Sequence, residues 1–160
     1  MKMDLIDSYL INLFGSIPPI QTKSDEEDKI NRFQVNGTDF RFLINPILDN
    51  KETNKYLMIN LVIINTYDLR KRMIIRNTWA KTRNTKVRTF FVCGIAAHAN
   101  YDPKKVNNVL KLESLHFNDI IQADFMDTYF NLTLKSIIAF KWIAMQFTSD
   151  LVQYVLKVDD

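Results

Sequence analysis

Residues 57–64 read LMINLVII, an apolar run that only Asn60 interrupts. A strand with one face in water alternates apolar and polar side chains, whereas a run of this kind is typical of a strand covered on both faces. Parallel sheets with helices on either side contain such strands. We therefore expect 57–64 to be a central strand of an α/β fold.

Strand-like and helix-like patterns alternate after this run. Apolar spacing predicts a helix over 69–79, and Asp102-Pro103 is a typical N-cap and first-turn pair that opens a second helix. The other predicted elements are strands at 87–92, 120–121 and 152–158 and a deeply packed helix at 133–147. Four alternations indicate a mostly parallel sheet with helices on both faces.

The first 52 residues differ from the rest of the chain. Pro18-Pro19 and an acidic cluster at 25–28 are typical of an extended or poorly packed segment, and only 40–44 is strand-like. We therefore divide the chain into a stem-like or irregular leader, 1–52, and a regular α/β part, 53–160.

Composition excludes several classes of protein. A net charge of +3, with 21 basic and 18 acidic side chains scattered among each other, does not make the basic stripe of a nucleic-acid binder. A single cysteine excludes an intrachain disulfide and a cysteine-based zinc site. The sequence contains neither G-x-G-x-x-G nor a P-loop. The apolar stretch at 5–17 is shorter than the roughly 20 residues of a bilayer crossing, so no membrane anchor is visible.

Polar residues follow the predicted strands where parallel sheets bind ligands, beyond the carboxyl ends. These residues are Asn65, Thr66, Gly94, Asp124, Asp159 and Asp160. The last two come after a strand that we expect to be buried, so they could help to hold a divalent cation and the diphosphate it bridges, or they could be a solvated chain end.

Two arginines share one face of the helix predicted at 69–79. Arg72 and Arg76 are four residues apart, so they could hold phosphate groups by charge-assisted hydrogen bonds. The alternative is that they pair with an acidic surface of the protein.

Other polar and aromatic residues have structural explanations. Asp124 and Asp127 are expected to cap the next helix, or otherwise to line the cleft. Cys93, Trp79 and Trp142 lie among apolar residues and are expected in the core.

Four segments, in order, resemble glycosyltransferase family 31, the β-1,3-galactosyltransferase and β-1,3-N-acetylglucosaminyltransferase family. Residues 71–80, KRMIIRNTWA, are similar to its R-R-x-A-I-R-x-T-W-G motif, and 90–94, FFVCG, to its V-F-x-L-G strand. Glu113 with 119–136 is similar to its E-x(5)-D-I-I-x-x-D-F-x-D-x-Y-x-N-L-T-L-K-[ST] block. Residues 154–160, YVLKVDD, match Y-V-x-K-x-D-D-D without its last Asp, so the chain resembles a C-terminally truncated member.

The resemblance implies a function for residues 53–160. They would be the GT-A-like, donor-nucleotide-binding part of an inverting enzyme that moves a hexosyl unit from UDP-galactose or UDP-N-acetylglucosamine to a glycan acceptor on a glycoprotein or glycolipid, in β-1,3 linkage. Mn²⁺ is the implied cofactor, with Asp159 at the metal. The nucleotide-sugar contacts would be Asn65, Thr66, Arg72, Arg76, Asp159 and Asp160. The third Asp and the catalytic base would lie beyond residue 160, so we expect this chain alone to be inactive.

The resemblance also implies a cellular setting, that of single-pass type II membrane proteins of the Golgi apparatus that act in protein glycosylation. Two N-glycosylation sequons, at Asn36 and Asn131, agree with this route, although Asn131 could instead cap the helix that follows it. The alternative function is a non-catalytic, truncated relative that serves as a binding or folding partner of a full-length transferase.

Overall fold

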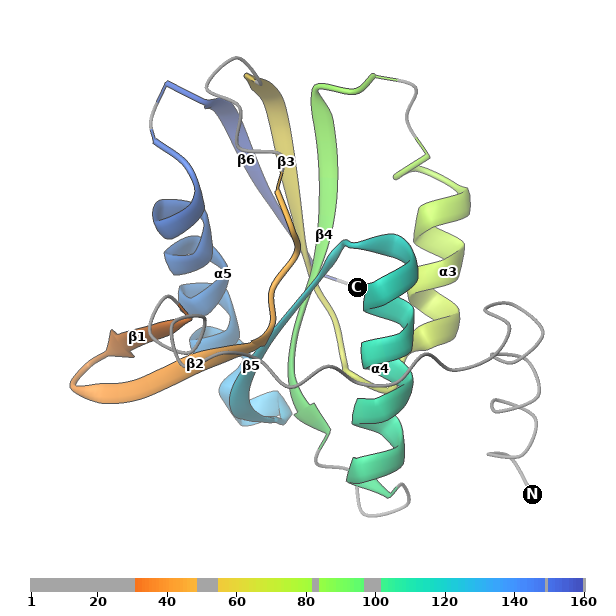
Figure 1. Cartoon of the computed structure of the whole chain (residues 1–160), viewed down its shortest axis with the longest axis vertical. Helices are drawn as coiled ribbons and strands as arrows, with labels where there is room; N and C mark the ends of the chain where they lie inside the picture. The colour runs from red at the N-terminus through yellow and green to blue at the C-terminus, as the bar shows by residue number, and fades with distance from the viewer. Residues whose placement is uncertain (1–30, 49–54, 82–83, 97–101, 149, 160) are drawn as a thin grey trace.

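The computed structural model describes residues 31–48, 55–81, 84–96, 102–148 and 150–159. Within these ranges, six strands form one sheet, and three α-helices and a short 3-10 turn connect or cover them (Figure 1). The elements are β1 (Arg32–Val35), β2 (Thr38–Ile44), β3 (Tyr56–Ile63), α3 (Leu69–Asn77), β4 (Val87–Ala96), α4 (Pro103–Phe117), β5 (Ile120–Asp127), η1 (Tyr129–Asn131), α5 (Leu132–Gln146) and β6 (Val152–Asp159).

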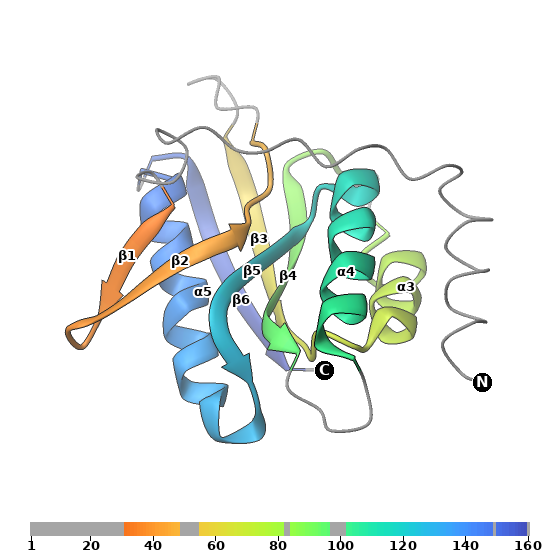
Figure 2. The same cartoon turned by 60° about the horizontal axis from the view of Figure 1, so that its bottom comes forward.

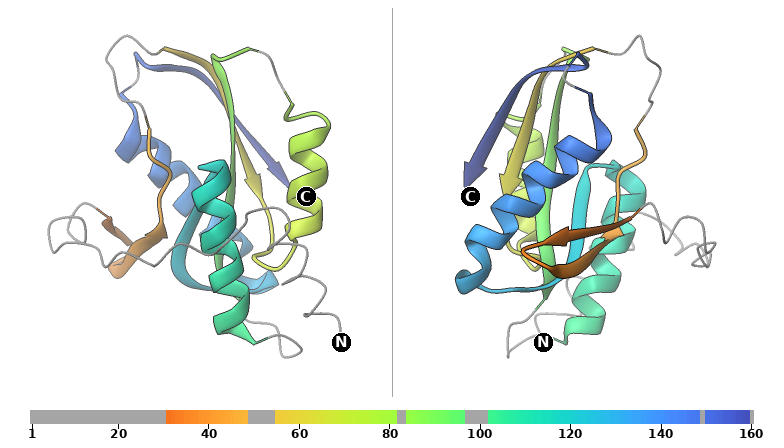
Figure 3. Two further views of the ribbon diagram at one scale, coloured as in Figure 1. Left: turned by 45° about the vertical axis from the view of Figure 1, so that its right-hand side comes forward. Right: turned by 90° about the vertical axis from the view of Figure 1, so that its left-hand side faces the viewer.

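The sheet has the order β1-β2-β5-β4-β3-β6. The β5–β4, β4–β3 and β3–β6 pairs are parallel, while β2 pairs antiparallel with both β5 and β1. Helix α5 lies on one face of the sheet, and α3 and α4 lie on the other (Figure 3). The predicted α/β class is therefore confirmed, and so are the alternating elements after residue 56.

Strand β3 is covered on both faces, as its composition predicted. Its alternate side chains Leu61 and Ile63 pack in one cluster with Trp142 of α5. Val62 and Ile64, which point the other way, pack with Phe91 and with α3. Period-two alternation divides the side chains of the strand between two apolar layers, so no polar face is needed.

Strands β1 and β2 form a hairpin inside the segment that was predicted to be irregular. Its turn has positive φ angles at both central residues, 50° at Asn36 and 78° at Gly37, the conformation that Asn-Gly sequences favour in two-residue hairpins. The Phe33 and Phe42 rings stack at 4.5 Å over the core, and β2 lies beside β5 (Figure 2). The other residues of the 1–52 leader fall mostly outside the described ranges, and the domain division at residue 52 stays a prediction.

Three expectations about burial were wrong. Strand β6 lies at the sheet edge, where Leu156 remains 48% exposed. Helix α5 buries one face only, with Phe140 on its other side half exposed. Trp79, just after α3, is 51% exposed, whereas Trp142 is fully buried as predicted. Apolar composition makes burial favourable, but the sheet order decides which apolar faces have a neighbour.

Candidate functional site

The strand order changes direction between β3 and β6. From β3 the chain goes to β4 and β5 on one side and then returns to the other side of β3 as β6. The crossovers of such a sheet leave on opposite faces, and a crevice opens beyond the carboxyl ends of the two diverging strands. A cavity of about 490 Å³ lies there, lined in part by Asn65 after β3 and by Asp159 of β6. Its size is that of a small-molecule site.

Asp127, the last residue of β5, is a buried anchor beside this cavity. One of its carboxylate oxygens accepts hydrogen bonds from the backbone N–H of Thr66 (3.1 Å) and of Gly94 (3.0 Å), and lies 2.8 Å from the Thr66 hydroxyl. Its other oxygen lies 2.6 Å from the Lys135 ammonium group. The side chain thus ties β5, β4, α5 and the loop after β3 together.

Gly94 has no room for a side chain at this junction. A Cβ atom there would lie 2.5 Å from the Phe125 carbonyl oxygen. The β4–β5 register also shifts between Cys93 and Ile95. The close approach of β5 places the Gly94 N–H within reach of Asp127, which explains why glycine is needed here.

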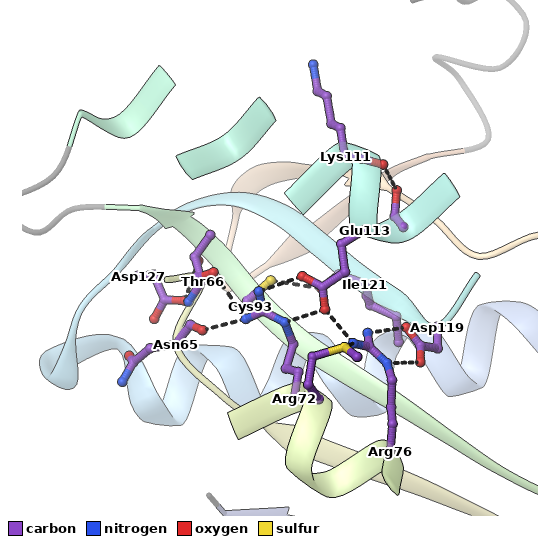
Figure 4. A network of polar contacts seen from close by, with 12 residues as sticks. Asn65, Thr66, Arg72, Arg76, Cys93, Lys111, Glu113, Asp119, Ile121 and Asp127 are labelled. Atoms are coloured by element: carbon purple, nitrogen blue, oxygen red, sulfur yellow. Dashed lines mark hydrogen bonds and ion pairs between the residues drawn. The ribbon is translucent and has the colours of Figure 1, made fainter. Parts of the chain in front are cut away.

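On the opposite face, Arg72 of α3 is buried against Glu113 of α4. Its guanidinium group donates two hydrogen bonds to the Glu113 carboxylate, of 2.8 and 2.7 Å. It also donates to the backbone carbonyl oxygens of Asn65 (2.9 Å) and Thr66 (3.1 Å). Figure 4 shows this network and its connection to the loop after β3.

Arg76 continues the network one helical turn later. It donates two 2.8 Å hydrogen bonds to Asp119 and lies 2.7 Å from Glu113. Its guanidinium group lies over the Phe91 and Phe117 rings, at 4.7 and 4.0 Å from their centroids. Burial lowers the pKa of Arg76, but the hydrogen bonds and charges of Asp119 and Glu113 outweigh it, so the pKa is raised. Arg76 is therefore a permanent cation.

The structure separates the predicted nucleotide contacts into two groups. Asn65 and Asp159 line the cavity. Thr66 and Arg72 are each 1% exposed and belong to the buried networks, and Arg76 is paired with Asp119 and Glu113. These partners favour the alternative that the arginines pair with acidic residues of the protein. Asp160 lies outside the described residues.

A divalent cation fits Asp159 in part. Its side chain is 62% exposed at the cavity, and its oxygen accepts a hydrogen bond from Lys157 at 2.7 Å. An exposed carboxylate repels a diphosphate unless a cation lies between them, and hard oxygen ligands suit Mn²⁺. Within the described ranges, however, no three acidic, histidine or cysteine side chains cluster as a metal site would require.

Asp127 does not cap the next helix but lines the cavity, which was the alternative prediction for it. The predicted cap by Asp124 was wrong, because Asp124 lies within β5 and pairs with Arg41. The Asn131 side chain makes no cap hydrogen bond to α5 and donates instead to the Met126 carbonyl oxygen. Strand β5 is longer than predicted, so Asp127, and not Asp124, stands at its carboxyl end.

Cys93 is confirmed as a core residue. It is fully buried, and burial raises the pKa of its thiol to about 12. The thiol therefore stays protonated at neutral pH and is not a nucleophile.

Comparison with known proteins identifies the family. The family model described as "Galactosyltransferase" matches residues 70–160, from α3 to the end of β6. The chain belongs to the galactosyltransferase family. The match includes both buried carboxylates of the site, Glu113 and Asp127, and one of the two strands that bracket the cavity. The predicted resemblance is confirmed.

Curated galactosyltransferase relatives are named for β-1,3 transfer. UDP-GalNAc:beta-1,3-N-acetylgalactosaminyltransferase 1 of Mus musculus is 37% identical over 124 residues, which are 76% of this chain and 36% of the relative. The Homo sapiens protein of that name gives the same values. Beta-1,3-galactosyltransferase 5 of Gorilla gorilla gorilla is 39% identical over 108 residues, 66% of this chain and 34% of the relative. The chain spans about a third of the length of these relatives.

Sequence reasoning named Glu113 and Asp127 but missed that each is paired with a buried cation. Glu113 stands three residues after Leu110, on the buried face of α4, and a charged residue on an apolar helix face is a signal for a buried partner. Lys135 is a second signal of this kind, since it is buried beside Ile138 and Ala139 of α5. Neither signal identifies the partner of the buried charge. Glu113 pairs with Arg72, 41 residues away, and Lys135 pairs with Asp127, 8 residues away.

Proposed function

We propose that this chain forms the donor-binding part of a hexosyltransferase. The intact enzyme would move a hexosyl unit from a UDP-sugar, such as UDP-galactose or UDP-N-acetylglucosamine, to a glycan acceptor on a glycoprotein or glycolipid, in β-1,3 linkage and with inversion. The observation that supports this most is the cavity at the switch point between β3 and β6, lined by Asn65 and Asp159. Family membership and the names of the relatives supply the reaction class.

Each lining group has a defined part in the proposal. The Asn65 side chain offers an amide donor and acceptor to the nucleotide sugar. Asp159 would hold Mn²⁺, and the bound metal would neutralise charge on the departing diphosphate. Asp160 would contact the nucleotide sugar. Arg72 and Arg76 contribute by holding the elements around the cavity, since their guanidinium groups are paired with carboxylates.

Nucleotide binding to the 160-residue chain tests this proposal directly. Isothermal titration calorimetry with UDP and Mn²⁺ should show saturable binding, and Asp159→Asn should weaken it about tenfold or more, because it removes the charge of a metal ligand. The matched control is Asp150→Asn, which changes an exposed carboxylate just before the other end of the same strand. Equal binding by wild type and Asp159→Asn, or no binding at all, would contradict the proposal. Stable association with a full-length transferase in the absence of UDP binding would favour the alternative, non-catalytic function.

We also propose that the protein passes through the secretory route to the Golgi apparatus as a type II membrane protein. None of the helices in the described part of the chain has both the length and the apolar character of a membrane crossing. Asn36 supports the route, since it is exposed in the β1–β2 turn, whereas the Asn131 side-chain nitrogen is engaged by Met126. In animal cells the protein should lose mass on N-glycosidase treatment, and Asn36→Gln should remove that loss. Unchanged mass of the wild type would refute the route.

A further inference from the structure

The loop after β3 has its three successive carbonyl oxygens held by buried cations. Lys135 donates to the Ile64 oxygen at 3.0 Å, from the face of α5. Arg72 donates to the Asn65 and Thr66 oxygens at 2.9 and 3.1 Å, from the face of α3 (Figure 4). Lys135 and Arg72 are 3% and 1% exposed. The loop is therefore clamped from both faces of the sheet.

The remaining polar groups of Thr66 are also engaged, on Asp127. Its N–H donates to the carboxylate at 3.1 Å, and its hydroxyl lies 2.8 Å from both the same carboxylate oxygen and the Gly94 carbonyl oxygen. A hydroxyl has one proton. Both acceptors already receive other donors, since Gly94 accepts from Gln122 and the Asp127 oxygen accepts from two backbone N–H groups. We assign the hydroxyl proton to Asp127 because a carboxylate is a stronger acceptor than a carbonyl oxygen.

The charges around the loop balance on each face. Lys135 is paired with Asp127, while Arg72 and Arg76 are paired with Glu113 and Asp119. Buried ion pairs are seldom worth more to stability than apolar residues of similar volume, because desolvation offsets their attraction. Two such networks converging on one loop therefore suggest a role in fixing its conformation rather than in adding to the core.

Asn65 is the part of the loop that is left for a ligand. Its carbonyl points at Arg72, and its side chain extends the other way (Figure 4). The side chain is half buried and lines the cavity, and no described residue hydrogen-bonds to it. The residues on either side of Asn65 are held by hydrogen bonds, so its backbone loses little conformational entropy when the side chain binds a ligand. A small entropy loss favours affinity.

We propose that Thr66 and Asp127 are positioning residues for the donor nucleotide. Held by Lys135 and Arg72, they fix the loop so that the Asn65 amide meets the UDP part of the substrate. This inference rests on the proposed function. It gives Thr66 a role in positioning the loop after β3, in place of the predicted direct contact with the nucleotide sugar. Thr66 is 1% exposed, so it acts on the ligand through Asn65 and not by touching it.

Thr66→Val and Thr66→Ser form a matched pair for the test. Valine keeps the shape but removes the hydroxyl proton from Asp127, while serine keeps the hydroxyl. In calorimetry with UDP and Mn²⁺, Thr66→Val should raise Kd about tenfold, as loss of a charged hydrogen bond predicts, and Thr66→Ser should stay within about twofold. Phe33→Leu controls for stability alone, since β1 lies at the other edge of the sheet, and it should lower the unfolding free energy without changing Kd.

Amide hydrogen exchange supplies a second readout that needs no ligand. Residues 64–68 should exchange faster in Thr66→Val than in Thr66→Ser or Phe33→Leu. Unchanged exchange of this segment, or equal Kd values for Thr66→Val and wild type, would overturn the inference while leaving UDP binding intact. Absence of UDP binding by the wild type would instead overturn the proposed function, and this inference with it.

Discussion

Strands β3 and β6 are adjacent, parallel and similarly apolar in sequence, yet they lie in opposite environments. In β3, all four hydrophobic side chains from Ile59 to Ile63 are buried, at 2% exposure or less. In β6, Tyr154 and Leu156 remain 57% and 48% exposed, because the strand is at the edge of the sheet. The difference shows that an apolar sequence predicts a strand of the sheet, whereas the position of that strand in the sheet order decides how far its side chains are buried.

The carboxyl ends of the two strands differ in the same way. The loop after β3 is surrounded by buried, fully paired charges. At the end of β6, Asp159 is exposed and pairs only with Lys157 among the described residues. The cavity between them thus has one wall that is fixed and one charged wall that is open to solvent, an arrangement that suits a preorganised contact beside a cation ligand.

Removing one buried charge beside β3 should have the largest effect on stability. Glu113→Gln leaves Arg72 and Arg76 with Asp119 as their one remaining carboxylate among the described residues, so we expect a loss of about 3–5 kcal/mol in unfolding free energy, as for other broken buried pairs. Lys157→Ala breaks the exposed pair at the end of β6 and should cost about 0–1 kcal/mol. Urea denaturation of both variants compares the two ends. Similar losses would mean that the charges beside β3 are not buried as described.

Matched apolar truncations should separate the two strands by a smaller margin. Leu61→Ala opens a cavity in the doubly covered core and should cost about 2–5 kcal/mol. Leu156→Ala removes a side chain that is already half in water and should cost about 1 kcal/mol. Thermal and urea unfolding measure both. If Leu156→Ala cost as much as Leu61→Ala, β6 would be covered in solution by something that packs on the sheet edge.

Much of the fold followed from local pattern. The predicted helices at 69–79 and 133–147 agree with α3 and α5 to within two residues at each end, and the Asp102 cap is present, accepting a hydrogen bond from Lys104 N–H. The hairpin at Asn36-Gly37 was predictable, because this dipeptide between two strands of alternating apolar and polar residues is a strong turn signal. It was not predicted because the rest of the leader is rich in polar residues. The extra length of β5 was not predictable from the sequence. Its pairing with β4 continues past a register shift, and no local sequence pattern indicates that shift.

The sequence predicted where the candidate site lies, but not the role of each residue in it. Strand ends pointed to Asn65 and Asp159, which line one cavity because a parallel sheet gathers carboxyl ends on one edge. Spacing alone gave Arg72 and Arg76 a common helix face, but it could not show that both face Glu113 and not solvent. The partner of a charge depends on packing between helices that are far apart in the chain.

By itself, the sequence determined the alternating elements after residue 56, the parallel part of the sheet and, through its motifs, the galactosyltransferase family. It did so because hydrophobic period, caps and contiguous motifs are properties of neighbouring residues. Only the tertiary structure decided that β6 is exposed, and that Arg72 and Thr66 hold the loop after β3. Burial and charge pairing depend on which distant segments meet, since a buried charge must find its partner wherever the fold brings one within hydrogen-bonding distance.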